Sequence, residues 1–288
     1  MPRVADLLRE KRTFSFEFTP PRDDAAQRRL EKALLKLERL QPDFTSVTYG
    51  ALGSTKDKTW EIVEHIHHNT SMPVMPHLTC VGHTRAQIEQ IVGGYRDMGI
   101  ENLLALGGDP PADGHPVADD FHFAAELIDA VREIGDFCIG VAAFPELHPR
   151  SPDRETDRRH LAAKLRLADF AITQFGFAPD DYFRMVDELA ALGVDTPVIP
   201  GVMLFTNVDG LRRMARLNNA AIPADLDAAL DRVAGDPTET RKLAVEWGTR
   251  IAAELLERGV PGIHFYTMNA SHATLDLYEK LGLTPTAP

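Results

Sequence analysis

The chain has 288 residues, of which 44% are hydrophobic and 26% are charged, a composition ordinary for a globular protein. Its formal net charge of −12 argues against a nucleic-acid-binding surface, which would be rich in lysine and arginine. No apolar run is long enough to cross a membrane, and residues 1–12 carry charges throughout, unlike a signal peptide. The two cysteines, Cys80 and Cys138, lie inside apolar runs and are expected to be buried thiols in a reducing compartment. We therefore expect a cytoplasmic protein without nucleic-acid or membrane partners.

Strands and helices are expected to alternate along almost the whole chain. After a short amphipathic helix in residues 1–12, three phenylalanines alternate with polar residues over residues 13–19, which is the period-two pattern of a strand. Pro20 and Pro21 end this strand, because proline has no N–H to donate to a sheet. The other strands are predicted at residues 44–50, 73–80, 102–106, 137–143, 170–174, 198–202 and 263–266. Helices are predicted at residues 23–40, 58–69, 84–98, 120–134, 153–167, 180–192 and 271–281, with several helical segments between residues 207 and 257.

The alternation of eight strands with helices, without a low-complexity linker, predicts a single (β/α)8 TIM barrel of the α/β class over residues 1–288. The length fits, because such barrels typically have about 250 residues. A doubly wound open sheet is the alternative. It is disfavoured because no glycine-rich dinucleotide fingerprint follows a strand: Gly107 and Gly108 lead through Asp109 into two prolines and not directly into a helix.

The first predicted strand carries a carboxylate where one is costly. Glu17 projects from one face near the C-terminal end of this strand, and the active sites of parallel barrels lie at that end of the strands. Among aromatic side chains and shielded from water, a glutamate has its pKa raised by desolvation, which suits a proton donor near neutral pH. The alternative is an outward-facing glutamate on an edge strand, and this strand alone does not decide between the two.

Polar side chains also follow most of the other predicted strands. Because the strand ends of a barrel converge, one rim is expected to carry Glu17, Thr48, Tyr49, His77, Thr79, Asp109, Glu146, His148, Gln174 and Tyr266. Two carboxylates, an amide and a tyrosine on one rim favour a site for a polar heterocycle with a proton donor. Glu146 and His148 do not predict a metal site, because no further ligands stand at metal-site spacing. A histidine such as His77 is more often structural than catalytic, and the aromatic rim residues fit packing equally well.

Seven short motifs at these strand ends occur in one order along the chain. They are Phe16-Glu17-Phe18-x-Pro20-Pro21, Ser46-Val47-Thr48-Tyr49-Gly50, Pro76-His77-Leu78-Thr79-Cys80, Leu106-x-Gly108-Asp109-x-Pro111, Ala171-Ile172-Thr173-Gln174-Phe175, Ile199-Pro200-Gly201 and His264-Phe265-Tyr266-Thr267-x-Asn269. With these motifs in register, the chain resembles the catalytic barrel of methylenetetrahydrofolate reductase over nearly its whole length. One such motif would be a weak signal, but seven in order are specific.

The resemblance implies an oxidoreductase that reduces 5,10-methylenetetrahydrofolate to 5-methyltetrahydrofolate in one-carbon metabolism, serving methionine biosynthesis. Glu17 matches the family's general acid, which protonates a nitrogen so that the imidazolidine ring opens to an iminium cation. Asp109 matches the carboxylate that faces the pterin, and Gln174 matches the amide that hydrogen-bonds the pterin edge. Thr48 and Tyr266 match further substrate-binding positions. The implied hydride donor is a reduced nicotinamide cofactor, NADH or NADPH.

The positions where the family holds FAD are only partly kept. This chain has Gly107 where the family has an arginine, and Phe144 where it has a tyrosine. His160 and Ala163 stand where the family has an asparagine and a second arginine. The candidates that remain for a nicotinamide or residual flavin site are His77, Phe144, His148, Asp157 and Lys164. We therefore predict that bound FAD is absent or weak, and that hydride passes directly from the nicotinamide.

Two alternatives remain open. The first is a conventional flavoprotein of the family, which would hold FAD and pass hydride through it in a ping-pong reaction. The second is a barrel of another class, which would bind folate without turnover and act as a regulatory or partner protein. Retention of Glu17, Asp109 and Gln174 together speaks against it, because a binder has no need of a buried acid. The expected partners are methylenetetrahydrofolate and a nicotinamide dinucleotide, and a homo-oligomer is compatible with the sequence.

Overall fold

The computed structural model describes residues 1–49, 56–108, 118 and 120–285 of the chain. Within these residues the strands are β1 (Thr13–Phe18), β2 (Phe44–Val47), β3 (Val74–Thr79), β4 (Asn102–Leu106), β5 (Cys138–Ala143), β6 (Phe170–Phe175), β7 (Val198–Met203) and β8 (Gly262–Tyr266). The helices are α1 (Val4–Glu10), α2 (Asp24–Leu37), the 3-10 turn η1 (Glu38–Leu40), α3 (Lys56–Asn69), α4 (Arg85–Met98), α5 (Ala124–Ile134), α6 (Arg154–Leu165), α7 (Pro179–Ala191), α8 (Val208–Leu217), α9 (Ala224–Val233), α10 (Pro237–Glu257) and α11 (Ser271–Lys280). The predicted alternation of strands and helices is confirmed, with element ends shifted by a few residues.

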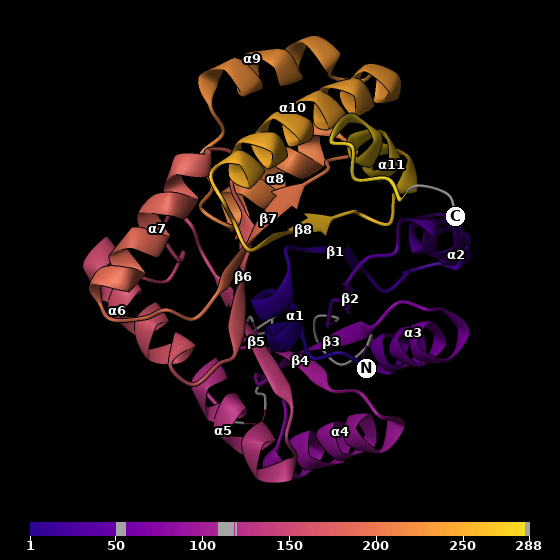
Figure 1. The fold of residues 1–288 in the computed structure, drawn as a ribbon. Coiled ribbons are helices and arrows are strands. Elements are labelled where there is room, and N and C mark those ends of the chain that lie inside the picture. The colour runs from indigo at the N-terminus through magenta and orange to yellow at the C-terminus, as the bar shows by residue number, and fades with distance from the viewer. Residues whose placement is uncertain (50–55, 109–117, 119, 286–288) are drawn as a thin grey trace.

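The strands form one closed parallel barrel in chain order, with β8 hydrogen-bonded back to β1. Helices surround this barrel in Figure 1, which looks along it with α1 across the centre. The register places Glu17 beside Ser46 of β2 and beside Tyr266 of β8. The predicted (β/α)8 barrel is therefore confirmed. The open doubly wound sheet is excluded, because a closed barrel has no edge strands.

Apolar side chains fill the barrel interior from its N-terminal end. Val4 of α1 packs there with inward-facing residues of β2 to β7, namely Phe44, Met75, Leu104, Cys138, Phe170, Ile172 and Ile199. Asn102 fixes α1 in place, because its side chain accepts the N–H of Val4 at 2.8 Å and donates to the carbonyl of Pro2 at 2.9 Å. Cys80 and Cys138 are free and buried as expected, and burial raises the pKa of each thiol to about 11. The N-terminal end of the barrel is thus closed, and the opposite end is left for chemistry.

The helix ends follow local chemistry. Thr84 and Gln87 form a reciprocal capping box at the start of α4, and Gly99 ends this helix with a left-handed φ of +85°. Helix α5 begins later than predicted. Phe121 is buried in the core, and the Glu126 carboxylate accepts the N–H groups of residues 122 and 123, so the chain turns there before the helix begins.

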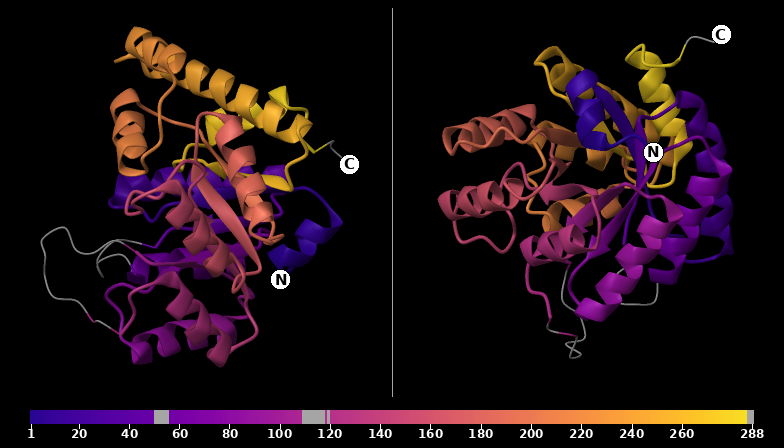
Figure 2. Two further views of the ribbon diagram at one scale, coloured as in Figure 1. Left: turned by 90° about the vertical axis from the view of Figure 1, so that its left-hand side faces the viewer. Right: turned by 60° about the horizontal axis from the view of Figure 1, so that its bottom comes forward.

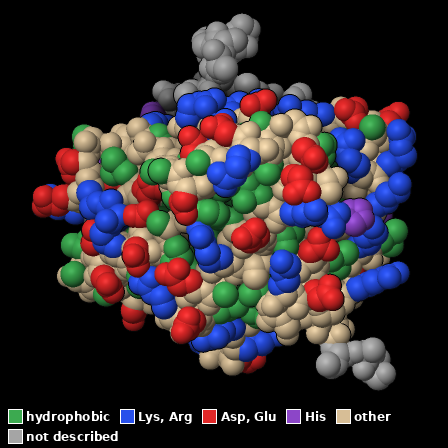
Figure 3. Space-filling view, turned by 90° about the horizontal axis from the view of Figure 1, so that it is seen from above, with side chains coloured by type: hydrophobic (Ala, Val, Ile, Leu, Met, Phe, Trp, Pro, Cys, Tyr) green, Lys and Arg blue, Asp and Glu red, His purple; other side chains and the backbone are tan. Residues whose placement is uncertain are grey.

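Between β7 and β8 the chain forms three helices, α8, α9 and α10, where a glycine and two prolines interrupt the helical pattern of the sequence. Helices α9, α10 and α11 lie together on one side of the molecule (Figures 1 and 2). Figure 3 views this side, on which acidic and basic side chains are interspersed and neither sign gathers into one patch. None of the helices in the described part of the chain has the length and apolarity that crossing a bilayer requires.

Candidate active site

Glu17 lies at the C-terminal mouth of the barrel and faces inward. Its side chain is 15% exposed, and Oε2 lies 3.6 Å from Nε2 of His77 on β3 and 3.8 Å from Nε2 of His264 on β8. The alternative of an outward-facing glutamate on an edge strand is therefore wrong, because β1 is paired on both sides and the carboxylate meets two interior histidines. Burial lowers the pKa of His77 to about 4, opposed by the nearby Glu17 carboxylate, so His77 is neutral near pH 7.

His264 anchors the floor beneath Glu17, and sequence reasoning assigned it no role. This histidine is buried, and its Nδ1 is 2.8 Å from Oγ of Ser15 while its Nε2 is 3.4 Å from Oγ of Ser46. Its ring also stacks on Phe44, with centroids 6.1 Å apart. The signal was present in the sequence, because the period-two alternation that turns Glu17 inward also turns Ser15 inward, and the same alternation applies to β8.

The exit of β8 clamps the exit of β1. Thr267 donates its hydroxyl to the carbonyl of Glu17 at 2.7 Å. The Asn269 amide both accepts the N–H of Thr19 at 3.0 Å and donates to its carbonyl at 2.8 Å. Met268 and Asn269 hold left-handed φ values of 53° and 54°, which non-glycine residues adopt at some cost and which cluster at functional sites. This strained turn fixes the backbone that presents the Glu17 carboxyl group.

Gln174 stands at an irregularity of β6. The pairing of β6 with β7 shifts between Ile172 and Phe175, so β6 has one residue more than β7 over this stretch. Such bulges re-aim a side chain and are frequent beside active sites. The Gln174 side chain is half-buried and makes no hydrogen bond to the described residues. Its amide donor and acceptor are thus available together at the mouth.

The side chain of Tyr266 on β8 reaches across β7 and supports this irregularity of β6. Its hydroxyl donates to the carbonyl of Thr173 at 2.6 Å, directly before Gln174. Burial, and secondarily the Glu17 carboxylate, raise the pKa of Tyr266 well above its ordinary value, so the hydroxyl keeps its proton. Gly201 is required beneath the ring, because a Cβ there would lie 2.5 Å from the Tyr266 ring and 2.4 Å from the Thr173 carbonyl oxygen. Tyr266 is therefore part of the support of Gln174.

The other two predicted folate positions differ in what the structure describes. Thr48 follows β2 and is half-buried, and its N–H donates to the carbonyl of Phe18 at 3.0 Å while its own carbonyl accepts the Thr59 hydroxyl at 3.1 Å. The strand exits around Glu17 are thus tied together. Asp109, predicted to face the pterin, lies outside the described residues.

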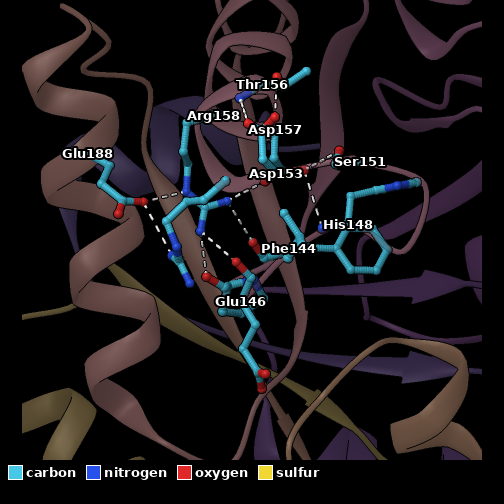
Figure 4. A network of polar contacts seen from close by, with 12 residues as sticks. Phe144, Glu146, His148, Ser151, Asp153, Thr156, Asp157, Arg158 and Glu188 are labelled. Atoms are coloured by element: carbon cyan, nitrogen blue, oxygen red, sulfur yellow. Dashed lines mark hydrogen bonds and ion pairs between the residues drawn. The ribbon is translucent and has the colours of Figure 1, made fainter.

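A buried ion network holds the loop between β5 and α6 (Figure 4). Arg158 of α6 is only 3% exposed, and it pairs with Asp157 and, through Nε at 2.6 Å, with Glu188 of α7. Its two terminal nitrogens also donate to three loop carbonyls, those of Phe144, Pro145 and Glu146. A buried guanidinium is costly to desolvate unless its donors are satisfied, and here the loop backbone satisfies them.

The same network uses the carboxylate of Asp157, a predicted cofactor-site residue. Asp157 Oδ1 accepts the N–H of His148 at 3.3 Å and the hydroxyl of Ser151 at 2.9 Å, and Oδ2 meets Arg158. Lys164 likewise donates to the protein itself, from Nζ to the carbonyl of Ala142 at 2.6 Å.

Burial sets the protonation of this lysine, and aromatic packing occupies the loop above it. Burial lowers the pKa of Lys164 to about 8, opposed by Asp157, so a protonated amine there is weakly favoured. Phe144 packs edge-on against the His148 ring, with centroids 4.5 Å apart. In the described residues no three His, Cys, Asp or Glu side chains converge as a metal site would need. Four of the five predicted cofactor residues, Phe144, His148, Asp157 and Lys164, therefore lie around one loop, whereas His77 lies beside Glu17.

A closed parallel barrel with a largely buried carboxyl group at its C-terminal mouth defines the class, a (β/α)8-barrel protein with Glu17 among interior histidines. A family model for methylenetetrahydrofolate reductase matches residues 3–282. The chain is 36% identical over 276 residues to 5,10-methylenetetrahydrofolate reductase of Pectobacterium carotovorum subsp. carotovorum, covering 94% of this chain and 90% of that protein. The chain belongs to the methylenetetrahydrofolate reductase family.

Two further comparisons bear on its length and fold. The chain is 32% identical over 285 residues to Methylenetetrahydrofolate reductase (NADH) 1 of Arabidopsis thaliana, covering 94% of this chain but 48% of the plant protein. Among solved structures, an uncharacterized protein from Clostridium thermocellum that binds two copies of 5-methyl-5,6,7,8-tetrahydrofolic acid aligns over 98% of each chain with a TM-score of 0.66. At 14% identity, that likeness shows the barrel fold alone.

Proposed function

We propose that this protein reduces 5,10-methylenetetrahydrofolate to 5-methyltetrahydrofolate with hydride taken directly from NADH or NADPH, and that Glu17 is the general acid. The observation that carries the proposal is the Glu17 carboxyl group, which is partly exposed at the C-terminal mouth and held there by the clamped exits of β1 and β8. The family membership supplies the substrate class, and the plant relative's name favours NADH as the donor.

The reaction needs one proton and one hydride. The proton passes from Glu17 to a ring nitrogen, so the carbon–nitrogen bond of the imidazolidine ring breaks and an iminium cation forms on the other nitrogen. Hydride from the dihydronicotinamide then adds to the methylene carbon, which becomes the methyl group, and the oxidised nicotinamide leaves. Glu17 regains its proton from water at the open mouth. Direct transfer requires the nicotinamide to lie against the pterin at near-attack distance.

The residues around Glu17 have complementary roles in this proposal. Gln174 hydrogen-bonds the pterin edge with its amide. Tyr266 and Gly201 support the irregularity of β6 that positions Gln174. Asp109 favours the positive charge that develops on the iminium. Thr48 lines the mouth beside the exit of β1.

A resident flavin fits the described residues poorly. The carboxylate of Asp157 is used by Arg158, His148 and Ser151, and the Lys164 amine is used by a barrel carbonyl. Phe144 has no hydroxyl to offer a flavin ring. The glycine at position 107 is weaker support than the sequence alone implies, because the guanidinium of Arg150 approaches that place from another loop. The case for flavin-free transfer thus rests on the polar groups already used by the protein.

The test is spectroscopic and kinetic. The purified protein should show no flavin absorbance, and it should oxidise NADH in the presence of methylenetetrahydrofolate without added FAD. Initial rates should follow a sequential pattern, because no carrier stores the hydride between two half-reactions. A yellow protein with stoichiometric flavin, or activity that appears only after FAD is added, would refute the flavin-free reaction and favour the conventional flavoprotein.

A further inference from the structure

Arg150 carries a guanidinium to the end of β4 from a different loop. Its Nη2 lies 3.9 Å from the position that a Cβ of Gly107 would occupy, and no other atom of the described residues, apart from the chain neighbours of Gly107, lies within 4 Å of that position. Arg150 is exposed, and no carboxylate within the described residues lies at ion-pair distance from it. An exposed cation without an ion-pair partner among the described residues is a candidate contact for an anionic ligand.

The loop that carries Arg150 is firmly held. The N–H of Arg150 donates to Nδ1 of His148 at 3.1 Å, and the N–H of Ser151 donates to the carbonyl of His148 at 2.9 Å. Asp157 holds both flanks of this turn, through the N–H of His148 and the hydroxyl of Ser151, and is itself fixed by buried Arg158 (Figure 4). The guanidinium therefore extends from a preorganised backbone, which lowers the entropy lost on binding.

Below the Arg150 guanidinium lies the backbone of Gly107 and Gly108. The carbonyl of Gly107 accepts the N–H of Val81 at 3.0 Å and the thiol of Cys80 at 3.1 Å, so the ends of β3 and β4 are locked together. Gly108 adopts a left-handed φ of +83°, and a Cβ there would lie only 3.0 Å from Cβ of Thr79. Glycine at both positions adds no side chain to the backbone below Arg150.

We propose that Arg150 binds the diphosphate of the nicotinamide dinucleotide, a role that rests on the proposed function above. The guanidinium stands at the ends of β4 and β5, whereas Glu17, Gln174 and Tyr266 belong to β1, β6 and β8. A dinucleotide whose diphosphate lies at the ends of β4 and β5 leaves the ends of β1, β6 and β8 to the folate, to which the proposed function also assigns Asp109, two residues after Gly107. A planar guanidinium suits a phosphate, because two parallel N–H groups reach two of its oxygens. FAD carries the same diphosphate, so the experiment separates the two ligands.

Calorimetry on the full chain tests this assignment with NADH, ADP-ribose, adenosine and FAD as probes. Arg150→Gln should raise the dissociation constants of NADH and ADP-ribose about 10- to 100-fold, as expected for one charged hydrogen bond, and leave that of adenosine unchanged. Arg159→Gln, on the exposed side of α6, is the matched control and should change none of them. Gly107→Arg in the Arg150→Gln background should recover affinity for NADH, since Gly107 has room for a side chain.

Each outcome has a defined meaning. If Arg150→Gln binds NADH and ADP-ribose within twofold of the wild type while the wild type reduces methylenetetrahydrofolate, the role of Arg150 is wrong and the proposed function stands. A loss confined to FAD assigns the guanidinium to a flavin and overturns the proposal. Failure of Gly107→Arg to recover any affinity counts against a direct guanidinium contact. A wild type that binds neither NADH nor ADP-ribose removes the direct hydride donor and, with it, this inference.

Discussion

The two halves of the barrel mouth differ in what their polar side chains bind. On the half formed by β6, β7, β8 and β1, the protein fixes the backbone around Glu17 and Gln174 and leaves the ends of both side chains at the mouth. On the half formed by β3, β4 and β5, the charged groups of Asp157, Arg158 and Lys164 bind the protein's own loop and strands. In the proposed function the first half acts on the folate, while the charged groups of Asp157, Arg158 and Lys164 in the second half hold a loop.

This difference suggests which residues of the family's site could be replaced while the proposed reaction is kept. In the proposed function, Glu17 and Gln174 contact the pterin with groups whose chemistry the reaction requires. A second ligand bound through its charge requires only a cation nearby, and a guanidinium on another loop can supply that charge. In our proposal Arg150 is such an exchange for an arginine at position 107, because its guanidinium lies 3.9 Å from the place of a Cβ there.

Of the substitutions proposed, replacement of Glu17 should have the largest effect on activity. Glu17→Gln keeps the shape of the side chain but removes the proton, so kcat for methylenetetrahydrofolate reduction should fall about 10²- to 10⁴-fold. Folate affinity, measured by fluorescence titration with 5-methyltetrahydrofolate, should stay within a few-fold. Glu31→Gln, on exposed α2, serves as the control. A Glu17→Gln variant that keeps more than a third of the wild-type kcat would remove Glu17 from the mechanism.

Breaking the ion network around Arg158 should lower the stability of the protein instead. Arg158→Met leaves Asp157 buried without its partner and three loop carbonyls without a donor, which should lower the free energy of unfolding by about 3–5 kcal/mol. Urea unfolding measures this loss. Arg159→Met, one residue along, removes an exposed cation and should cost less than about 1 kcal/mol. Equal losses in the two variants would contradict a structural role for the buried network.

The fold and half of the site could be predicted because their signals are local. Alternating phenylalanines, two prolines and repeated strand–helix pairs specify a closed barrel, and a closed barrel gathers its strand ends. Glu17 and Gln174 follow from their places on β1 and β6. Asp109 was predicted by the same reasoning and lies outside the described residues.

The remaining features depend on contacts between residues far apart in the chain. Nothing in the sequence near Arg158 indicates that it caps three carbonyls of a loop twelve to fourteen residues earlier. The approach of Arg150 to Gly107 joins two loops on different strands, and the bond from Tyr266 to Thr173 crosses β7. Pattern and composition do not encode such pairings, which arise only once the barrel has closed.

Removing the amide of Gln174 should have a moderate effect. Gln174→Ala deletes one donor and one acceptor at the pterin edge, so the KM for methylenetetrahydrofolate should rise about 5- to 100-fold. The melting temperature should change by no more than a few degrees, because the side chain makes no hydrogen bond to the described residues. Tyr266→Phe is the informative companion, since it removes the support of the β6 irregularity and should weaken folate binding less than Gln174→Ala does. Loss of folding in Gln174→Ala would favour a structural role instead.

The smallest effect should come from the pH dependence of stability at His77, the residue of β3 that faces Glu17. Its pKa is about 4 in the folded protein, against an ordinary value of 6.5, because it is buried. Between these values the unfolded chain binds more protons than the folded one, so the free energy of unfolding falls as pH falls from 6.5 toward 4. At pH 5 this amounts to about 2 kcal/mol, since one pKa unit corresponds to ~1.4 kcal/mol.

His77→Gln cannot take up this proton, and its stability measured by urea unfolding from pH 7 to pH 5 should fall less steeply than that of the wild type. His160→Gln, which alters an exposed histidine, should follow the wild-type curve. Parallel curves for the wild type and His77→Gln would show that the imidazole takes up its proton equally in the folded and unfolded chain, and the lowered pKa of His77 in the folded protein would then be wrong.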